Sequence, residues 1–268
     1  MNLYQKIIRR FVMKLSQLGN PKHRMSIKHA HIEGFDILVM ANEDVGRQIY
    51  SLGSFEPDET VFFRSVITED DVCFDIGGNV GYFAMLMAQC ASRGSVHVFE
   101  PIPLNAAIIR TNANINDFEH VTVNNVAVGD KSGSIKFTVA KDSAYSSMHS
   151  TGRVADSKVI DVPMITLDEY ANEHGIDKIN LIKIDVEGAE ELVARGAVEI
   201  LTNPERRPAT ILMELFDENL QPFGTDVNSI VNLLIKYGYK ANVLANGTKL
   251  TPYSPDMANR YYNIIFIA

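Results

Sequence analysis

The sequence has little cysteine and no apolar run long enough to cross a bilayer. Among its 268 residues are two cysteines, Cys73 and Cys90. Both stand in apolar surroundings, Cys73 in an expected strand and Cys90 on an expected helix, which favours reduced, buried thiols over a disulfide framework. No segment reaches the roughly 20 apolar residues of a membrane-spanning helix. We therefore expect a cytoplasmic protein.

Acidic residues are missing from the first 30 positions, which hold seven Lys or Arg. The rest of the chain has 18 basic residues against 33 acidic ones. Such an acidic body is poorly suited to nucleic-acid phosphates, so we expect no nucleic-acid partner.

The basic N-terminus has apolar residues at helical spacing from Leu3 to Leu18, with Lys6, Arg9 and Arg10 mostly on the other side. Two interpretations stay open. The helix could make a weak contact with an anionic membrane surface, or it could pack on the domain as part of a lid. Charges interrupt any apolar core and no small-residue cleavage site follows, so we do not expect a signal peptide.

Beyond this start, apolar runs of strand length alternate with helical patterns, which predicts a doubly wound α/β sheet whose parallel strands are covered on both faces. A polar stretch at 141–157 breaks the alternation and predicts a loop over one edge of the site. We expect an N-terminal helical and strand extension at 1–54 and one domain at 55–268. The expected strands include 30–41, 72–76, 95–100, 121–128, 179–185, 209–215 and 261–268, and the expected helices include 44–52, 57–66, 82–91, 103–115, 190–201 and 228–237.

The chemistry concentrates where the first two core strands end. The first runs into Asp75-Ile76-Gly77-Gly78-Asn79-Val80-Gly81, followed by a helix from Tyr82. Glycines allow a tight turn and close approach of a ligand, and the helix offers free N–H groups. Asp75 can accept hydrogen bonds from a cationic group. The second strand ends in Glu100-Pro101, where a carboxylate can bind both hydroxyls of a ribose.

The glycine pattern that binds dinucleotides is absent. Counting from Gly77, the third and sixth positions are Asn79 and Tyr82, where that pattern requires glycine. Asp75 would also stand close to a pyrophosphate. The loop therefore favours a zwitterionic, net cationic nucleoside cofactor over NAD, and it disfavours a dehydrogenase.

At this point the sequence resembles the FkbM family of class I, S-adenosylmethionine-dependent methyltransferases. The resemblance covers roughly Phe55 to Phe216. It is carried by FDIGGNVGYFAMLMA, VFEPIPLNAAIIRTNANIN, NNVAVGDKSG, Ser146-Ser147-Met148, VPMITLDEY and above all LIKIDVEGAEELVARGA, in the order typical of that family.

The resemblance implies a Rossmann-like sheet of seven strands, mostly parallel, with an antiparallel last strand near 261–267. It implies S-adenosylmethionine as the cofactor, with the ribose at Glu100 and the adenine near Ala127, Val128 and Asp130. The methionine part would lie along the glycine loop. The full set of expected cofactor-binding residues is Asp75, Gly77, Gly78, Asn79, Gly81, Tyr82, Glu100, Pro101, Ala127, Val128, Asp130 and Asp185.

Three further carboxylates are candidate catalytic residues. Asp185 and Glu187 follow the fourth strand of the parallel set and Glu214 ends the fifth, so all three should face the cleft. One of them could take the proton of an acceptor hydroxyl. Alternatively, Asp185 binds the cofactor or a backbone N–H, and Glu187 caps the next helix. The three could also hold Mg²⁺, but no zinc-type His/Cys spacing exists, and we expect no metal. His149, in the polar loop, is a further possible base.

The family resemblance favours O-methylation of a hydroxyl on a sugar or another small natural product. N-methylation of a small molecule is the nearest alternative, and a cofactor-binding module without catalysis is another. The terminal additions carry no readable code for the acceptor or the oligomeric state.

Overall fold

A computed structural model describes residues 26–140, 142–148, 158–245 and 249–268. The predicted N-terminal helix, His149 and most of the predicted loop at 141–157 lie outside the described residues. Within the described residues, no helix has the length and apolar character needed to cross a membrane. Cys73 and Cys90 are both free thiols, as expected.

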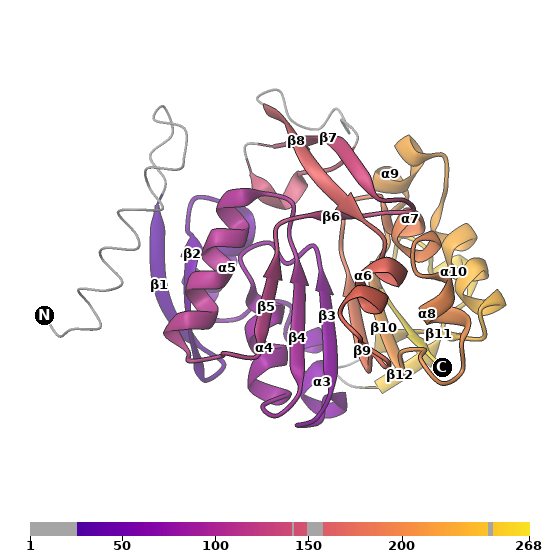
Figure 1. The fold of residues 1–268 in the computed structure, drawn as a ribbon, viewed down its shortest axis with the longest axis horizontal. Helices are drawn as coiled ribbons and strands as arrows, with labels where there is room; N and C mark the ends of the chain where they lie inside the picture. Colours follow the sequence, from indigo (N-terminus) through magenta and orange to yellow (C-terminus); the bar gives the residue numbers. More distant parts are fainter. Residues whose placement is uncertain (1–25, 141, 149–157, 246–248) are drawn as a thin grey trace, which may run out of the picture.

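The central sheet has eight strands in the order β12-β11-β13-β10-β9-β3-β4-β5 (Figure 1). The five strands from β10 to β5 pair in parallel, and β13 runs antiparallel to β10. The prediction of a mainly parallel α/β sheet is confirmed, but the predicted count of seven strands is wrong because β12 forms a hairpin with β11 and adds an eighth. The strands are β3 (Val72–Ile76), β4 (Ser95–Phe99), β5 (Val121–Asn124), β9 (Leu181–Ile184), β10 (Thr210–Glu214), β11 (Lys240–Ala245), β12 (Lys249–Pro252) and β13 (Asn263–Ile267).

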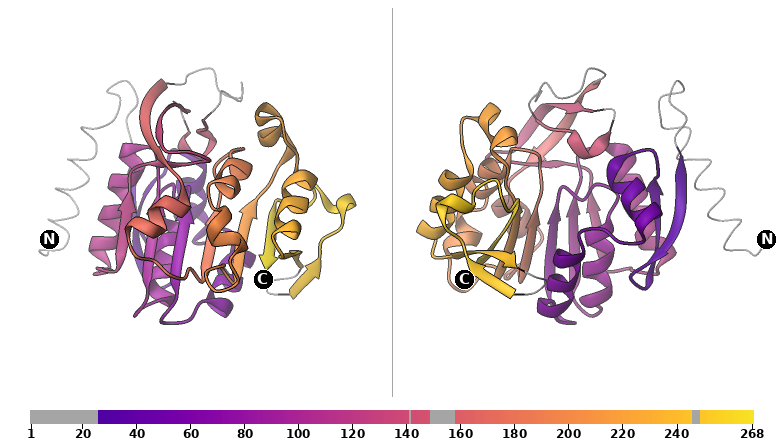
Figure 2. Two further views of the ribbon diagram at one scale, coloured as in Figure 1. Left: turned by 45° about the vertical axis from the view of Figure 1, so that its right-hand side comes forward. Right: turned by 180° about the vertical axis from the view of Figure 1, so that it is seen from behind.

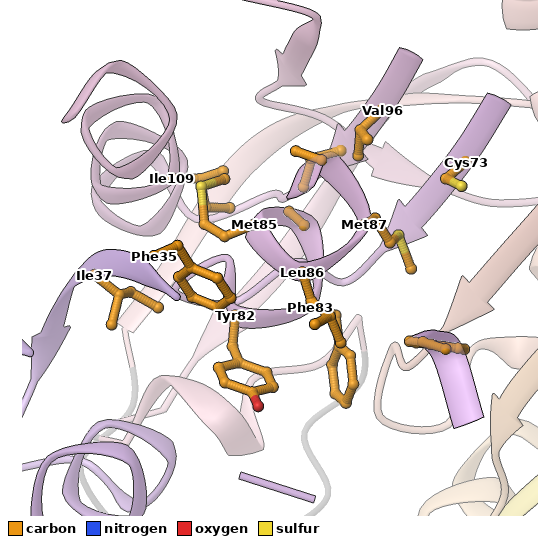
Figure 3. Packing of buried hydrophobic residues seen from close by; sticks show 14 of the residues in the cluster. Phe35, Ile37, Cys73, Tyr82, Phe83, Met85, Leu86, Met87, Val96 and Ile109 are labelled. Carbon is orange, nitrogen blue, oxygen red and sulfur yellow. The ribbon is translucent and has the colours of Figure 1, made fainter. Parts of the chain in front are cut away.

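Helices cover both faces of this sheet, and successive strand residues alternate between two cores (Figures 1 and 2). Cys73 packs into the first core and its neighbour Phe74 into the second. Figure 3 shows the first core, where Met85 and Leu86 of α4 pack near Val96. The helices are α3 (Pro57–Val66), α4 (Tyr82–Cys90) and α5 (Pro103–Ile115) on the first side and α6 (Leu167–Glu173), α7 (Glu190–Arg195), α8 (Val198–Thr202) and α10 (Val227–Lys236) on the second, while α9 (Asp217–Leu220) follows β10.

The predicted strand 30–41 is instead a hairpin of β1 (Ile27–Ile32) and β2 (Phe35–Met40), followed by α2 (Asp44–Leu52). Glu33 and Gly34 form the turn with φ of 54° and 84°, the left-handed conformations that a tight hairpin requires. Gly34, in the middle of the apolar run, was the sequence signal for this turn. The hairpin shares the first core with α4, and the division of the chain at 54/55 stays a prediction.

The predicted strand 121–128 is also two strands, which belong to different sheets. After β5 the chain leaves the central sheet, and β6 (Ala127–Val128) joins β7 (Gly133–Val139) and β8 (Lys158–Ile165) in a small sheet of order β6-β8-β7. This sheet lies above the carboxyl ends of β3, β4 and β5 (Figure 1). It brings chain from the middle of the sequence over the glycine loop.

The predicted helix 190–201 is divided into α7 and α8 at Gly196. A Cβ at Gly196 would stand 1.9 Å from the carbonyl oxygen of Gly129, so the two backbones are in direct contact there. This contact joins residues far apart in the sequence, which is why helical periodicity alone did not reveal the break.

Candidate functional site

The loop that follows β3 turns sharply against the loop that follows β9. Gly77 has φ 86°, and a Cβ there would lie 1.8 Å from the carbonyl oxygen of Asp185. Only glycine fits this close approach. The loop ends at Gly81, also at φ 86°, which is the N-terminal cap of α4. The backbone thus passes close under the space where a ligand would lie.

Glu100 ties this loop to the end of β4. One of its carboxylate oxygens accepts a hydrogen bond from the Asn79 backbone N–H at 2.9 Å, and the other accepts from the Ile102 N–H at 2.8 Å. Burial raises the pKa of Glu100 to about 8, although both hydrogen bonds act in the opposite direction. Each oxygen keeps a free lone pair, so the carboxylate can still accept two ligand hydroxyls.

Asp75 is a buried acid whose carboxylate is poorly satisfied by its neighbours, the Ala84 backbone N–H and the Lys183 ammonium. Its side chain is 1% exposed, and neither carboxylate oxygen accepts a hydrogen bond of good geometry within the described residues. Burial raises the pKa of Asp75 to about 6. Unsatisfied buried acceptors are costly, so such a group in a cavity wall indicates a missing donor such as a ligand ammonium.

Lys183 lies beside Asp75, and sequence reasoning missed it. The two residues are register partners on β9 and β3, so their side chains share one face of the sheet. The Lys183 ammonium donates to Asp185 Oδ2 at 3.0 Å and lies 5.1 Å from the centre of the Phe83 ring. Burial alone would lower its pKa, but the carboxylates of Asp185 and Asp75 hold the pKa above its usual value. A lysine inside an otherwise apolar strand was the available signal.

The three candidate catalytic carboxylates all line one cavity, in different states. Asp185 is ion-paired with Lys183, and Glu187 accepts a hydrogen bond from the Asn219 side chain at 2.7 Å. Glu214 ends β10, and repulsion from Asp185 together with burial raises its pKa above its usual value.

Glu190, rather than Glu187, accepts the hydrogen bonds of the backbone N–H groups that precede α7. Its Oε1 accepts from the backbone N–H groups of Val186 and Gly188 at 3.1 and 3.2 Å. It thereby braces the turn between β9 and α7 and leaves the Glu187 side chain to face the cavity and Asn219.

Glu56 is a second residue that sequence reasoning missed. It directly precedes α3 and adopts a left-handed conformation with φ 42° and ψ 68°, which is uncommon for glutamate. Its carboxylate lines the cavity, and burial raises its pKa to about 7. Phe55 anchors the segment by packing on Tyr82 and Phe83, with ring centres 5.5 and 6.0 Å apart.

These residues enclose a cavity of about 220 Å³ at the carboxyl ends of the parallel strands. Its roof comes from α2 and from the short helix η1 (Ser143–Tyr145), which are joined because Ser143 donates to the Glu43 carboxylate. Gly81 and Asp130 do not reach the cavity wall. The other expected residues do reach it: Asp75, Gly77, Gly78, Asn79, Tyr82, Glu100, Pro101, Ala127, Val128, Asp185, Glu187 and Glu214.

Metal ligation finds no support in this arrangement. Within the described ranges, no group of three His, Cys, Asp or Glu side chains has the geometry to hold a metal ion.

The family model of the methyltransferase FkbM domain matches residues 75–241, more than half of the chain. The chain belongs to the FkbM methyltransferase family. The resemblance stated from the sequence motifs is thereby confirmed. Lys183 lies inside the matched range and Glu56 lies outside it, so the family match carries no inference about Glu56.

Within this FkbM family the chain is similar to two curated methyltransferases. It is 29% identical to the 2-O-methyltransferase NoeI of Sinorhizobium fredii over 68% of this chain and 81% of NoeI. It is 30% identical to the hexuronic acid methyltransferase AglP of Haloferax volcanii over 62% of each protein. The chain therefore spans less than two thirds of AglP.

Among solved structures, the protein resembles the methyltransferase FkbM of Methylobacillus flagellatus, with a TM-score of 0.52 and 15% identity. The likeness covers 82% of this chain and 50% of that one. At this identity the likeness shows a shared α/β fold.

Proposed function

We propose that this protein is an S-adenosylmethionine-dependent O-methyltransferase acting on a hydroxyl of a sugar or another small natural product. The observation that carries the cofactor is the pair of buried acids at neighbouring strand ends. Asp75 has two acceptor oxygens without a partner, and Glu100 has oxygens positioned for two hydroxyls. An α-ammonium group and a ribose are the ligand parts that these acids fit.

The residues present fit the cofactor at three places. Asp75 and the glycine loop would hold the amino-acid part, Glu100 would hold the ribose, and Ala127 and Val128 of β6 would contact the adenine. Because neither oxygen of Asp75 accepts a hydrogen bond of good geometry, a bound ammonium would satisfy a buried acceptor. When bound, the cofactor supplies an electrophilic methyl group on a sulfonium.

The chain's own residues would then align the acceptor and remove its proton. The cavity is walled on the β9 and β10 side by Asp185, Glu187 and Glu214. Alignment of donor and acceptor lowers the barrier to in-line displacement. We propose that one of these carboxylates takes the hydroxyl proton, with Lys183 hydrogen-bonded to Asp185 and holding it in place. The 2-O-methyltransferase activity in the name of NoeI supports a hydroxyl acceptor.

Calorimetric titration with S-adenosylhomocysteine tests the cofactor assignment. We expect binding by the wild-type protein and roughly 10- to 100-fold weaker binding by Glu100→Ala, because two hydrogen bonds to the ribose hydroxyls are lost. Glu119→Ala is the matched control, since Glu119 is an exposed acid. NAD should not bind. Absence of S-adenosylhomocysteine binding by folded wild-type protein would overturn the proposal.

A further inference from the structure

Strand order divides the cavity into a cofactor side and an acceptor side. Glu100, Asp75, Asp185 and Glu214 stand at the ends of β4, β3, β9 and β10, which are consecutive neighbours in the sheet. With strands about 4.8 Å apart, Glu214 lies roughly 14 Å along the sheet from Glu100. If ribose and ammonium occupy the β4 and β3 positions, the end of β10 borders the space beyond the reacting sulfur.

Glu56 faces the same end of the cavity from a different layer. Glu214 pairs in register with Asn263 of β13, and the Asn263 side chain donates to Glu59 of α3 at 2.8 Å. This bond fixes the start of α3 beside the end of β10. Consistent with this proximity, the charge of Glu56 contributes to the raised pKa of Glu214. Both carboxyl groups line the cavity.

Glu56 and Glu214, like Asp75, differ from Asp185, Glu187 and Glu100 in their lack of side-chain hydrogen bonds. Asp185 is bonded to Lys183, Glu187 to Asn219, and Glu100 to two backbone N–H groups. Within the described part of the chain, no donor reaches the carboxyl group of Glu56 or Glu214. Their oxygens are therefore free to meet a ligand.

The cavity wall is rich in carboxyl groups and poor in basic groups. Seven carboxyl residues line it against one basic residue, Lys183, among the described residues. The Lys183 side chain is 5% exposed and already paired with Asp185, so it is not available to a carboxylate or phosphate of an acceptor. Independently, the orphaned oxygens of Asp75, 1% exposed, show that this cavity is built for a ligand that donates hydrogen bonds.

We propose that Glu56 and Glu214 form the acceptor-facing wall of this cavity and select acceptors by charge. Neutral hydroxyl-bearing and amine-bearing molecules would bind against the two carboxyl groups. Molecules with a carboxylate or phosphate near the reacting group would be excluded because this part of the wall offers no free cation and because the carboxylates of Glu56 and Asp185 repel them. This inference rests on the proposed methyl transfer. It would distinguish this chain from its relative AglP, whose name specifies a hexuronic acid.

A charged cofactor analogue tests the wall without knowledge of the acceptor. Sinefungin carries an amine where S-adenosylmethionine carries its methylated sulfur, whereas S-adenosylhomocysteine carries no charge there. By calorimetry we expect the wild-type protein to bind sinefungin at least roughly tenfold more tightly than S-adenosylhomocysteine. E56Q should reduce that ratio to within about threefold, and E214Q should reduce it to a smaller degree, with S-adenosylhomocysteine affinity preserved.

D58N is the matched control, because Asp58 is an exposed acid in the first turn of the same helix. It should keep the wild-type ratio. Equal affinity for the two analogues in the wild-type protein, or a ratio unchanged in both E56Q and E214Q, would overturn the inference. Failure of S-adenosylhomocysteine to bind at all would instead overturn the cofactor assignment, and this inference with it.

An acceptor series then tests selection directly. Methyl glucoside, methyl glucosaminide and methyl glucuronide differ in one charged group, and formation of S-adenosylhomocysteine reports transfer. We expect kcat/KM for the glucuronide to be at least about 100-fold below kcat/KM for the glucoside or the glucosaminide, whichever is the better acceptor. The E56Q variant should show a smaller difference in kcat/KM. A glucuronide that is methylated as fast as the glucoside would contradict the proposal. If none of the three is turned over, the analogue ratio decides alone.

Discussion

At the scale of single residues, the site holds a charged lysine in a buried position. Lys183 is buried between acids of three different elements, and the fixed positive charge compensates Asp185, Asp75 and Glu56 together. A buried ion pair gives little net stability, but removal of one partner leaves an uncompensated charge. The role of Lys183 is thus to let an acidic cavity exist inside the fold.

Lys183→Met should therefore destabilise the protein by about 3–5 kcal/mol at pH 8. The loss should be smaller at pH 5, where the orphaned carboxylates can take up protons. Chemical denaturation at the two pH values measures both effects. Lys178→Met, at an exposed site near the start of β9, should change stability by no more than about 0.5 kcal/mol. Equal losses for the two variants would contradict the compensating role.

Gly77 shows how the backbone limits the site. Gly77→Ala adds a Cβ 1.8 Å from the Asp185 carbonyl oxygen in addition to the cost of φ 86°. Gly224→Ala is a matched control, since Gly224 has φ 77° and open space around it. We expect Gly224→Ala to cost about 1–2 kcal/mol in unfolding free energy from conformation alone. Gly77→Ala should cost clearly more and should abolish S-adenosylhomocysteine binding in calorimetry. Similar behaviour of the two would show that the loop tolerates the clash by moving.

At the scale of elements, side chains of α5 and of its C-terminal cap form hydrogen bonds with the backbone of β2 in the N-terminal hairpin. Asn116 and Asn112 stand one turn apart, and their side-chain amides pair with the backbone N–H and C=O groups of Asp36 and Leu38 on β2. Each amide thus makes the pair of hydrogen bonds that a neighbouring strand would make. Asn112 also donates to the Val80 carbonyl in the glycine loop at 2.8 Å. The hairpin is attached to the same helix that supports the glycine loop.

Asn112→Ala should leave buried backbone groups of Leu38 and Val80 without partners. Because each unsatisfied group costs about 1–3 kcal/mol, we expect a total loss of about 3 kcal/mol in unfolding free energy. Asn116→Ala, at a partly buried site, should lose about 1 kcal/mol. Asn114→Ala, on the exposed face of α5, should change little. An Asn112 variant as stable as the Asn114 variant would mean that water replaces the amide.

At the scale of the whole molecule, buried acids make folding depend on pH in an unusual direction. Burial raises the pKa of Glu100 to about 8 and of Glu56 and Glu190 to about 7, all from an ordinary value of 4.5. Between these values the folded protein binds more protons than the unfolded chain. Stability must then decrease as pH rises through this window.

The free protein should accordingly be more stable at pH 6 than at pH 8, by at least about 1 kcal/mol. Urea denaturation at the two pH values, with S-adenosylhomocysteine absent, measures the difference. Glu100→Gln, which cannot ionise, should reduce it. Greater stability at pH 8 would show that these carboxyl groups are ionised in the folded state.

The sequence by itself determined the parts of this protein that depend on neighbouring residues. The turn after β3, the acid that ends β4 and the carboxylates after β9 and β10 were all predicted. Their positions follow from a short apolar run, a glycine pattern and the rule that parallel strands end at one edge. The alternation of strands and helices was likewise enough for the fold class, because covered parallel strands leave a local apolar signature.

Tertiary structure decided what depends on contacts between distant segments. The break at Gly196 exists because another backbone occupies the space of a side chain. The run 121–128 divides between two sheets because β8, about 40 residues further along, pairs with its second half. Glu56 reaches the cavity only because α3 packs beside β10, and Lys183 carries its charge only because three acids converge on it. Charge compensation and burial arise from this convergence, and no local pattern in the chain records it.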